Sequence, residues 1–200
     1  MLMTDIHVRS FSGSGIRPYV HSIAKLRCEI LKDYPYFEDL NPHTEADILR
    51  KLSLSPEAIG VLIFENTTLV GVSFGYPLVL EEIELHTPFK EKGWDIDSCY
   101  FFGESTLLKP YRGRGIGHHF FDARELFVSQ FPSFKRICFC APTSIDSIEE
   151  RPSDFVPMHD FWRKRGYIHH PEMQVTAHKK RAGDYPNEIP LSFWIKNLTL

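Results

Sequence analysis

Residues 102–117 read FGESTLLKPYRGRGIG, and this stretch decides what kind of fold the chain adopts. The residues from Tyr100 to Leu108 predict a strand that ends shortly before the glycines. After the glycines, apolar residues recur at helical spacing, at Ile116, Phe120, Ala123 and Phe127. A strand, a glycine-rich turn and a helix in this order present the backbone N–H groups of the helix start to an anion.

The glycine-rich turn has the features of a phosphate-binding loop. Gly113, Gly115 and Gly117 let the backbone approach a phosphate without an intervening Cβ atom. Arg112 and Arg114 add positive charge beside it. A helix terminus contributes only about 0.3–1 kcal/mol per anionic group, so several N–H hydrogen bonds must together bind the anion. The spacing differs from the dinucleotide motif G-x-G-x-x-G, and the Gly-Lys-Ser/Thr of a P-loop is missing.

Two helices are predicted in the N-terminal part of the chain. Pro18 opens the first, since proline is favoured at the first helical position, and Pro35 ends it. The second helix is expected to start at Thr44, with Asp47 placed like the acid of a capping box, and to end by Pro56.

The other elements complete a mixed α/β order. Strands are predicted at residues 6–8, 59–65, 69–76, 136–140, 174–178 and 191–195. The second and third of these form a hairpin, and the last two form an antiparallel pair. A polar, acidic connector is expected over residues 81–97. A loop rich in proline and serine, residues 142–157, leads to a short helix over residues 159–165 that Gly166 ends. We expect a single domain over residues 1–200.

Two stretches resemble motifs of one protein superfamily. Residues 112–117, RGRGIG, match the pyrophosphate-binding motif Q/R-x-x-G-x-G/A of the GNAT superfamily of acyl-CoA-dependent N-acetyltransferases. Residues 161–167, FWRKRGY, are similar to its late motif F/L-Y-x-K-x-G-F, and both stretches are similar to a bacterial subgroup. The resemblance implies a single GNAT-like α/β domain. Its central sheet would be mixed, mostly antiparallel and flanked by helices, with the glycine loop between the motif strand and its helix.

The resemblance also implies acetyl-CoA as co-substrate. The pantetheine arm would lie along the motif strand, where Leu107 stands at the family's usual valine and offers its backbone groups. A primary amine would then attack the thioester directly in a ternary complex, without a covalent enzyme intermediate. The residues implied to contact the cofactor are Leu107, Leu108, Lys109, Arg112, Gly113, Arg114, Gly115, Ile116, Gly117, His118 and Trp162.

Glu104 is the candidate general base. A lysine-like amine has a pKa near ~10.4, so at pH 7 about one molecule in 2,500 is unprotonated and a base or a water chain is needed. Glu104 lies three residues before Leu107 in an otherwise apolar strand, where a charge needs a reason. The alternative is that Glu104 faces solvent or pairs with an arginine.

The group that protonates the leaving thiolate departs from the family pattern. The family places a tyrosine four residues before the glycine of the late motif, and here that position is Trp162. An indole N–H donates hydrogen bonds but cannot act as an acid in this role. Either His159, almost one turn earlier in the helix, or water protonates the thiolate instead. The alternative for His159 is a solvated side chain without a catalytic role.

Composition and charge restrict the expected cellular compartment and the expected binding partners. A formal net charge of −3 and a pI of about 6.4 argue against a nucleic-acid partner. The apolar run from Leu69 to Leu80 is too short for a membrane span, and the N-terminus shows no signal-peptide pattern. The 4 cysteines form neither a CxxC nor a zinc-ligand set, so we expect a reducing cytoplasm and no metal.

The acceptor is expected to be a small-molecule or peptidyl amine. Carboxylates near the second helix and in the connector would attract a cationic amine; the alternative is a solvated acidic surface. These carboxylates belong to Glu38, Asp39, Glu45, Asp47, Glu81, Glu82, Glu84, Glu91, Asp95 and Asp97. Paired C-terminal strands are also a common place for such domains to form homodimers.

A second class of function stays open beside the enzyme. It is a catalytically impaired acyl-CoA-binding module that works as a sensor or partner protein. Trp162 at the usual tyrosine position favours this module, whereas Glu104 argues against it. A third class is nucleotide or nucleic-acid binding through Arg112, Arg114, Lys135 and Arg136. The negative charge and the missing nucleotide motifs disfavour it.

Overall fold

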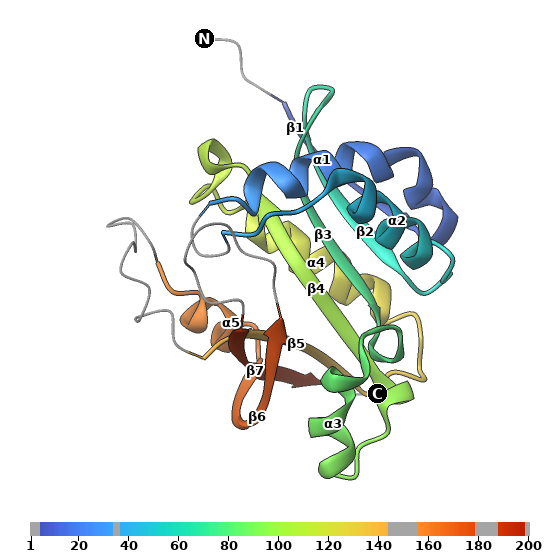
Figure 1. Cartoon of the computed structure of the whole chain (residues 1–200), viewed down its shortest axis with the longest axis vertical. Coiled ribbons are helices and arrows are strands. Elements are labelled where there is room, and N and C mark those ends of the chain that lie inside the picture. The colour runs from blue at the N-terminus through green and yellow to red at the C-terminus, as the bar shows by residue number, and fades with distance from the viewer. Residues whose placement is uncertain (1–4, 34–36, 144–155, 179–187, 199–200) are drawn as a thin grey trace.

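The computed structural model describes residues 5–33, 37–143, 156–178 and 188–198 (Figure 1). In these ranges the strands form one 7-stranded sheet in the order β1-β2-β3-β4-β5-β7-β6. Neighbouring strands are antiparallel, except that β4 and β5 run parallel. The strands are β1 Ile6–Ser12, β2 Ile59–Glu65, β3 Thr68–Pro77, β4 Cys99–Leu107, β5 Arg136–Pro142, β6 Ile168–His178 and β7 Glu188–Asn197.

Helices cover both faces of this sheet (Figure 1). They are α1 Val20–Ile30, α2 Pro42–Leu52, α3 Ile83–Glu91, α4 Ile116–Val128 and α5 His159–Lys164. On one face α1 and α2 pack over β2 and β3, and α3 packs over β4, β5 and β7. On the opposite face α4 covers β2 and β3 and, with α5, covers β5 and β7. The predicted α/β fold with a mixed, mostly antiparallel sheet is confirmed.

The start of α2 differs from the sequence prediction. The helix begins at Pro42, and the Asn41 side chain accepts hydrogen bonds from the backbone N–H groups of His43 and Thr44. Asparagine is among the best N-cap residues, and proline suits the first helical position. The predicted start at Thr44 is therefore wrong, and Asp47 forms an ion pair with Arg50 of the same helix, at 2.6 Å, instead of closing a capping box.

The acidic connector contains a helix that the sequence does not predict. Helix α3 takes up most of residues 81–97, although Pro88 lies inside it and proline normally disfavours a helix interior. Its buried side holds Phe89, whose ring meets that of Phe193 of β7 edge to face at 4.9 Å. Packing of this aromatic ring onto the sheet outweighs the local propensity.

Several other predictions are confirmed. The β2–β3 hairpin, helix α4 and strand β5 lie where the sequence places them, and the β6–β7 pair is antiparallel as predicted. Strand β6 begins at Ile168, however, and not at residue 174. Pro18 does not open the first helix: it lies in a 3-10 segment, η1 Gly13–Tyr19, and α1 begins after it at Val20. Pro35 and most of the proline- and serine-rich loop fall outside the described residues. No helix in the described part of the chain is long and apolar enough to cross a membrane.

Candidate active site

Strands β4 and β5 separate soon after they start. Residues Cys99–Phe101 of β4 pair with Arg136–Cys138 of β5, and the register then stops although both strands continue. The partners on their other edges, β3 and β7, stay paired further along. The two strands therefore diverge into a V within the described part of the sheet (Figure 1).

A bulge in β4 lies at this separation. Ser73 of β3 stands opposite Ser105, whereas Gly75 stands opposite Phe102, so one residue of β3 faces both Gly103 and Glu104. An extra residue in one strand reverses the faces to which the following side chains point.

The reversal is visible in the contacts on either side of the bulge. Phe102 packs with Phe121 of α4, so it lies on the α4 face. Glu104 would share that face in a regular strand, but its carboxylate contacts Arg27 of α1 on the opposite face. The bulge therefore turns Glu104 toward α1 and α2.

The glycine loop follows the end of β4 and leads into α4. Gly113 and Gly115 have positive φ values of 71° and 78°, and Gly115 caps the helix in the left-handed conformation. A Cβ atom added at Gly113, Gly115 or Gly117 meets no heavy atom within 4 Å. The loop thus presents an open backbone surface at a helix start, where the first N–H groups lack helical partners.

The residues beside the glycines divide into packed and exposed ones. The side chains of Leu107, Leu108 and Ile116 pack into the core under α4. Arg112 donates from Nε to the Leu107 carbonyl at 2.9 Å and ties the loop to β4. Since Leu108 donates to the Val70 carbonyl of β3, the preceding Leu107 points its backbone groups to the other side, toward the V. The exposed cations and imidazole of the loop belong to Lys109, Arg114 and His118.

Arg27 joins two helices to the bulge. Its guanidinium lies 2.9 Å from Glu45 of α2 and 2.8 Å from Glu104 of β4, and all three side chains are largely buried. Burial lowers the pKa of Arg27, but the two carboxylates raise it by more, so the pKa lies above its ordinary value. Of the two alternatives to catalysis, pairing with an arginine is the one that the geometry shows for Glu104.

Tyr76 lies on the same side of the bulge. A Cβ atom added to Gly103 would stand 3.1 Å from the Tyr76 hydroxyl, so glycine at 103 makes room for the phenol. The hydroxyl donates to Glu81, and burial together with that carboxylate raises the pKa of Tyr76 well above its ordinary value. The buried Tyr76 phenol and three carboxylates thus gather near Arg27, beside the point where β4 and β5 separate. The carboxylates are those of Glu45, Glu81 and Glu104.

Comparison with solved structures identifies this architecture. No protein-family model matches the chain, and no curated protein matches it in sequence. A GNAT-family acetyltransferase from Streptococcus pneumoniae superposes with a TM-score of 0.61 at 12% identity, over 97% of this chain and 100% of that one. The ribosomal-protein-alanine N-acetyltransferase from Brucella melitensis gives 0.63 at 10% identity, over 96% and 99%. A Salmonella typhimurium protein assigned as an acetyltransferase, solved with its cofactor acetyl-CoA, gives 0.63 at 9% identity, over 97% and 94%.

The chain has the GNAT fold.

Within this GNAT fold, Trp162 and His159 lie on α5, above β5 and β7. The Trp162 ring stands 5.0 Å from Phe139 and 5.1 Å from Trp194, so it is packed as part of an aromatic cluster. The His159 ring stacks on Trp194 at 5.3 Å and faces His169 of the edge strand β6. These contacts place Trp162 over the β5 arm of the V and His159 further away, over β7.

The predicted acceptor carboxylates do not all come together. Glu45 and Glu81 join Glu104 at the bulge, and Glu38 is buried near the start of α2. The rest are exposed: Asp39, Asp47, Glu82, Glu84, Glu91, Asp95 and Asp97. Among the described residues, no group of three or more His, Cys, Asp or Glu side chains could hold a metal.

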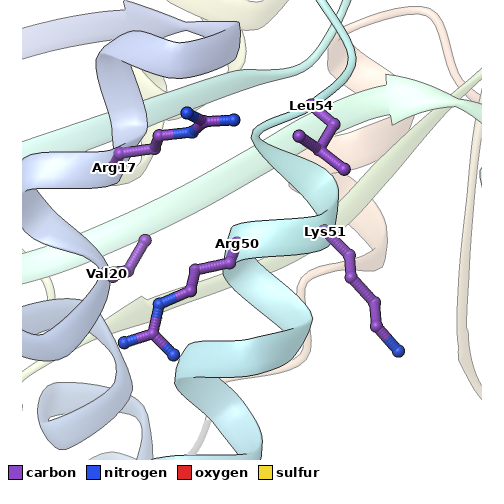
Figure 2. A pocket seen from close by; sticks show the side chains of 5 residues that line it. All are labelled: Arg17, Val20, Arg50, Lys51 and Leu54. Carbon is purple, nitrogen blue, oxygen red and sulfur yellow. The ribbon is translucent and has the colours of Figure 1, made fainter.

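A separate groove of about 350 Å³ lies between η1–α1 and α2 (Figure 2). Val20 and Leu54 supply apolar surface, and the side chains of Arg17, Arg50 and Lys51 rise around it in different directions. Arg17 contacts Ser53 and Arg50 contacts Asp47, so both guanidinium groups are already bound to neighbouring side chains. The groove shares no residue with the V or the glycine loop.

Sequence reasoning missed Arg27 and Tyr76. Arg27 falls within an otherwise ordinary amphipathic helix, and nothing in its spacing points to β4. Gly103, directly before Glu104, was the available signal, because glycine inside a strand often marks a bulge or a close approach.

Proposed function

We propose that this protein transfers an acetyl group from acetyl-CoA to a primary amine by direct attack in a ternary complex. The observation that carries the proposal is the V between β4 and β5, which opens next to a glycine loop at a helix start. The loop suits a pyrophosphate, and the unpaired edge of β4 suits a chain with amide groups. The likeness to the Salmonella typhimurium protein solved with acetyl-CoA supports the choice of cofactor.

Different residues of the chain bind different parts of acetyl-CoA. The backbone N–H groups around Gly115 and Gly117 bind the pyrophosphate, Lys109 and Arg114 add positive charge at the rim, and His118 offers its imidazole there. Arg112 is used within the protein, on the Leu107 carbonyl, so its contribution is to fix the loop against β4. The Leu107 N–H donates to the arm or to the thioester carbonyl.

The acceptor amine enters on the side of α1 and α2. Three carboxylates and one guanidinium meet there, which leaves an excess of negative charge that attracts a cationic amine. Glu104 accepts the proton from the amine, directly or through water, and Arg27 keeps its carboxylate in place. Both a small-molecule and a peptidyl amine fit this scheme.

Loss of the family's tyrosine leaves the thiolate to be protonated by water. His159 stacks on Trp194 away from β4, so water is the better candidate of the two that the sequence left open. Acid–base help is typically worth ~10²–10⁴-fold, whereas bringing two bound reactants together lowers a barrier by about 7–11 kcal/mol. The positioning effect is larger, so Trp162 is compatible with turnover.

Calorimetric titration with acetyl-CoA, with free CoA and ATP as controls, is the first test. We expect both CoA species to bind and ATP to bind much more weakly. A screen of polyamines, amino acids, aminoglycosides and peptides, read out as released thiol, then identifies the acceptor. If neither CoA species binds, the proposal and the binding-module alternative are both wrong.

Glu104→Gln separates the enzyme from the impaired module. We expect turnover to fall by roughly 10²-fold or more, with acetyl-CoA affinity within about threefold of the wild type. Unchanged turnover would mean that Glu104 serves only the ion pair with Arg27. Binding of acetyl-CoA without transfer to any acceptor in the screen would favour the sensor or partner module, for which Trp162 is the supporting observation.

The setting is part of the same proposal. We expect the protein to work in a reducing cytoplasm, since its cysteines at 28, 99, 138 and 140 are all outside disulfides. A homodimer would form through the edge of the sheet at β6, which pairs only with β7 in the described residues. Sedimentation analysis tests the dimer.

A further inference from the structure

A second arginine is buried behind the bulge, on the face opposite to Arg27. Arg124 of α4 is only 1% exposed. The ion pairs of the described residues do not include it, so its guanidinium lies in the core without a carboxylate in contact. A buried charge of this kind is costly unless its hydrogen bonds are satisfied, and such a group calls for an explanation.

The hydrogen bonds of Arg124 converge on the bulge. Nη1 donates to the backbone carbonyls of Phe74, at 2.9 Å, and Gly103, at 3.2 Å. Nη2 donates to the Ser105 hydroxyl at 3.1 Å, and that hydroxyl contacts the Ser73 hydroxyl at 2.9 Å. One guanidinium therefore donates to both strands at the register shift.

These contacts replace backbone hydrogen bonds that the bulge removes from the sheet. An extra residue disrupts the ladder of hydrogen bonds, and buried carbonyl groups need replacement donors. The planar guanidinium provides several donors in a fixed geometry, which a lysine ammonium does not. A fourth N–H, at Nε, donates to the Phe120 carbonyl one turn earlier in α4 and fixes the side chain to its own helix.

Two aromatic rings complete the site around the charge. The Arg124 guanidinium lies 4.1 Å from the Phe102 ring centroid and 4.9 Å from that of Phe121. Burial lowers the pKa of Arg124 to about 10, so the side chain stays protonated near neutral pH. The cation is thus retained, held by ring faces and carbonyl dipoles.

We propose that Arg124 is a positioning residue that sets the β4 bulge and thereby turns Glu104 toward Arg27 and the acceptor side. Without the extra residue, Glu104 would follow Phe102 onto the α4 face and lose its contact with Arg27. The catalytic meaning of this placement rests on the proposed function, whereas the control of register by Arg124 does not.

The test uses Arg124→Met and Arg124→Lys in the full-length protein. The lysine variant keeps the charge and most of the volume but cannot reach all three oxygen acceptors together, so it is the variant expected to fold. Proton NMR cross-strand contacts report the register, and the chemical shift of ¹³C-labelled glutamate, assigned with Glu104→Gln, reports the surroundings of the Glu104 carboxylate. Tyr167→Phe is the control, because Tyr167 contacts Glu125 of the same helix at 3.0 Å and takes no part in the register shift.

We expect both Arg124 variants to lose the Ser73–Ser105 contact and to change the ¹³C chemical shift of the Glu104 carboxylate, because it leaves its ion pair with Arg27. The Tyr167→Phe control keeps both signals. Acetyl-CoA affinity stays within about threefold in Arg124→Lys, because the glycine loop is untouched, while turnover with the acceptor from the screen falls about tenfold or more without a matching change in KM.

A folded Arg124→Lys protein with the wild-type register and an unchanged ¹³C shift of the Glu104 carboxylate would overturn the proposal. If Arg124→Met fails to fold, Arg124→Lys decides alone. The NMR measurements need no ligand, so absence of acetyl-CoA binding by the wild type would count against the proposed function and leave the result on the register standing.

Discussion

Gly115 and Gly117 are two residues apart in the same loop, yet substitutions at them act through different physics. Gly115 holds a positive φ of 78°, which side chains other than asparagine and aspartate rarely tolerate. Gly117 lies inside α4 with open space around its Cβ position. The two positions therefore allow strain and ligand contact to be separated.

For Gly115 we expect a pair of matched variants to differ in ligand binding. Gly115→Asn and Gly115→Asp accept the left-handed conformation about equally, and only the second adds a negative charge at the helix start. Gly115→Asp should bind acetyl-CoA at least about tenfold more weakly than Gly115→Asn, a difference of ~1.4 kcal/mol in calorimetry. Gly117→Ala, which the GNAT motif that this loop resembles admits, serves as the control with near wild-type affinity. Equal affinities for the Asn and Asp variants would argue against an anion at this loop.

Arg27 lends itself to a prediction about stability. Arg27→Met leaves Glu45 and Glu104 largely buried without their cation, and we expect the free energy of unfolding to fall by roughly 3–5 kcal/mol. Because the pKa of Arg27 is raised, its contribution is present at every pH below its unfolded value and is lost only as pH rises through the folded pKa. Denaturant unfolding should therefore show the same loss at pH 6 and pH 9. Arg27→Met combined with Glu45→Gln should recover part of it; no recovery would count against the shared ion pair.

At the scale of elements, the true start of α2 gives a direct comparison between sequence and structure. Asn41→Ala removes a side chain that accepts two backbone N–H bonds, so we expect a loss of about 0.5–2 kcal/mol in stability. Thr44→Ala lies at the start predicted from the sequence and should change stability by less than about 0.5 kcal/mol. Chemical denaturation of both variants measures the difference. A larger loss at Thr44 than at Asn41 would contradict the observed cap.

How far the elements could be predicted depended on whether their signal is local. Helix α4 and the β2–β3 hairpin carry their own periodicity and turn residues, so sequence alone places them. Helix α3 carries Pro88 and acidic residues that argue for a loop, and it forms because Phe89 is buried against Phe193 of a distant strand. The cap at Asn41 was missed because Thr44 and Asp47 fit a better-known pattern.

The candidate site was predictable only where chemistry lies in one continuous stretch. The glycine loop and Glu104 were found because both belong to residues 102–117. Arg27 and Arg124 lie on two helices far apart in sequence, and each reaches β4 only through the tertiary fold. Periodicity treats both as ordinary helix residues, so neither their burial nor their partners could be derived from it.

At the scale of the whole molecule, the cysteines report how the sheet is covered. Cys28, Cys99 and Cys138 are buried, whereas Cys140 is half-buried. Burial raises the pKa of Cys99 to about 11 and raises that of Cys28 and Cys138. In the native protein at pH 8 we expect a thiol reagent to label Cys140 first, and Cys140→Ser to remove most of the fast reaction. Fast labelling of several cysteines would mean that the core opens readily.

The same burial predicts weaker stability in alkali. An unfolded thiol loses its proton near pH ~8.5–9, while the buried thiol keeps it, so the unfolded state binds fewer protons and stability falls as pH rises. Between pH 7 and pH 10.5 we expect a loss of roughly 2–3 kcal/mol for each fully buried thiol, measured by denaturant unfolding. Cys138→Ala should reduce that slope. A flat profile would contradict the raised pKa values.

The V between β4 and β5 also means that the sheet has an edge in its interior. Most sheets carry unpaired edges only at their margins, where a strand of another protein can add. This edge lies between two covered faces, so a slender ligand with amide groups reaches it more easily than a second polypeptide strand. Such a ligand makes the hydrogen bonds that a neighbouring strand would otherwise make along this stretch of the sheet. We therefore expect occupancy to slow hydrogen exchange along both arms of the V and to make the two halves of the sheet unfold as one cooperative unit.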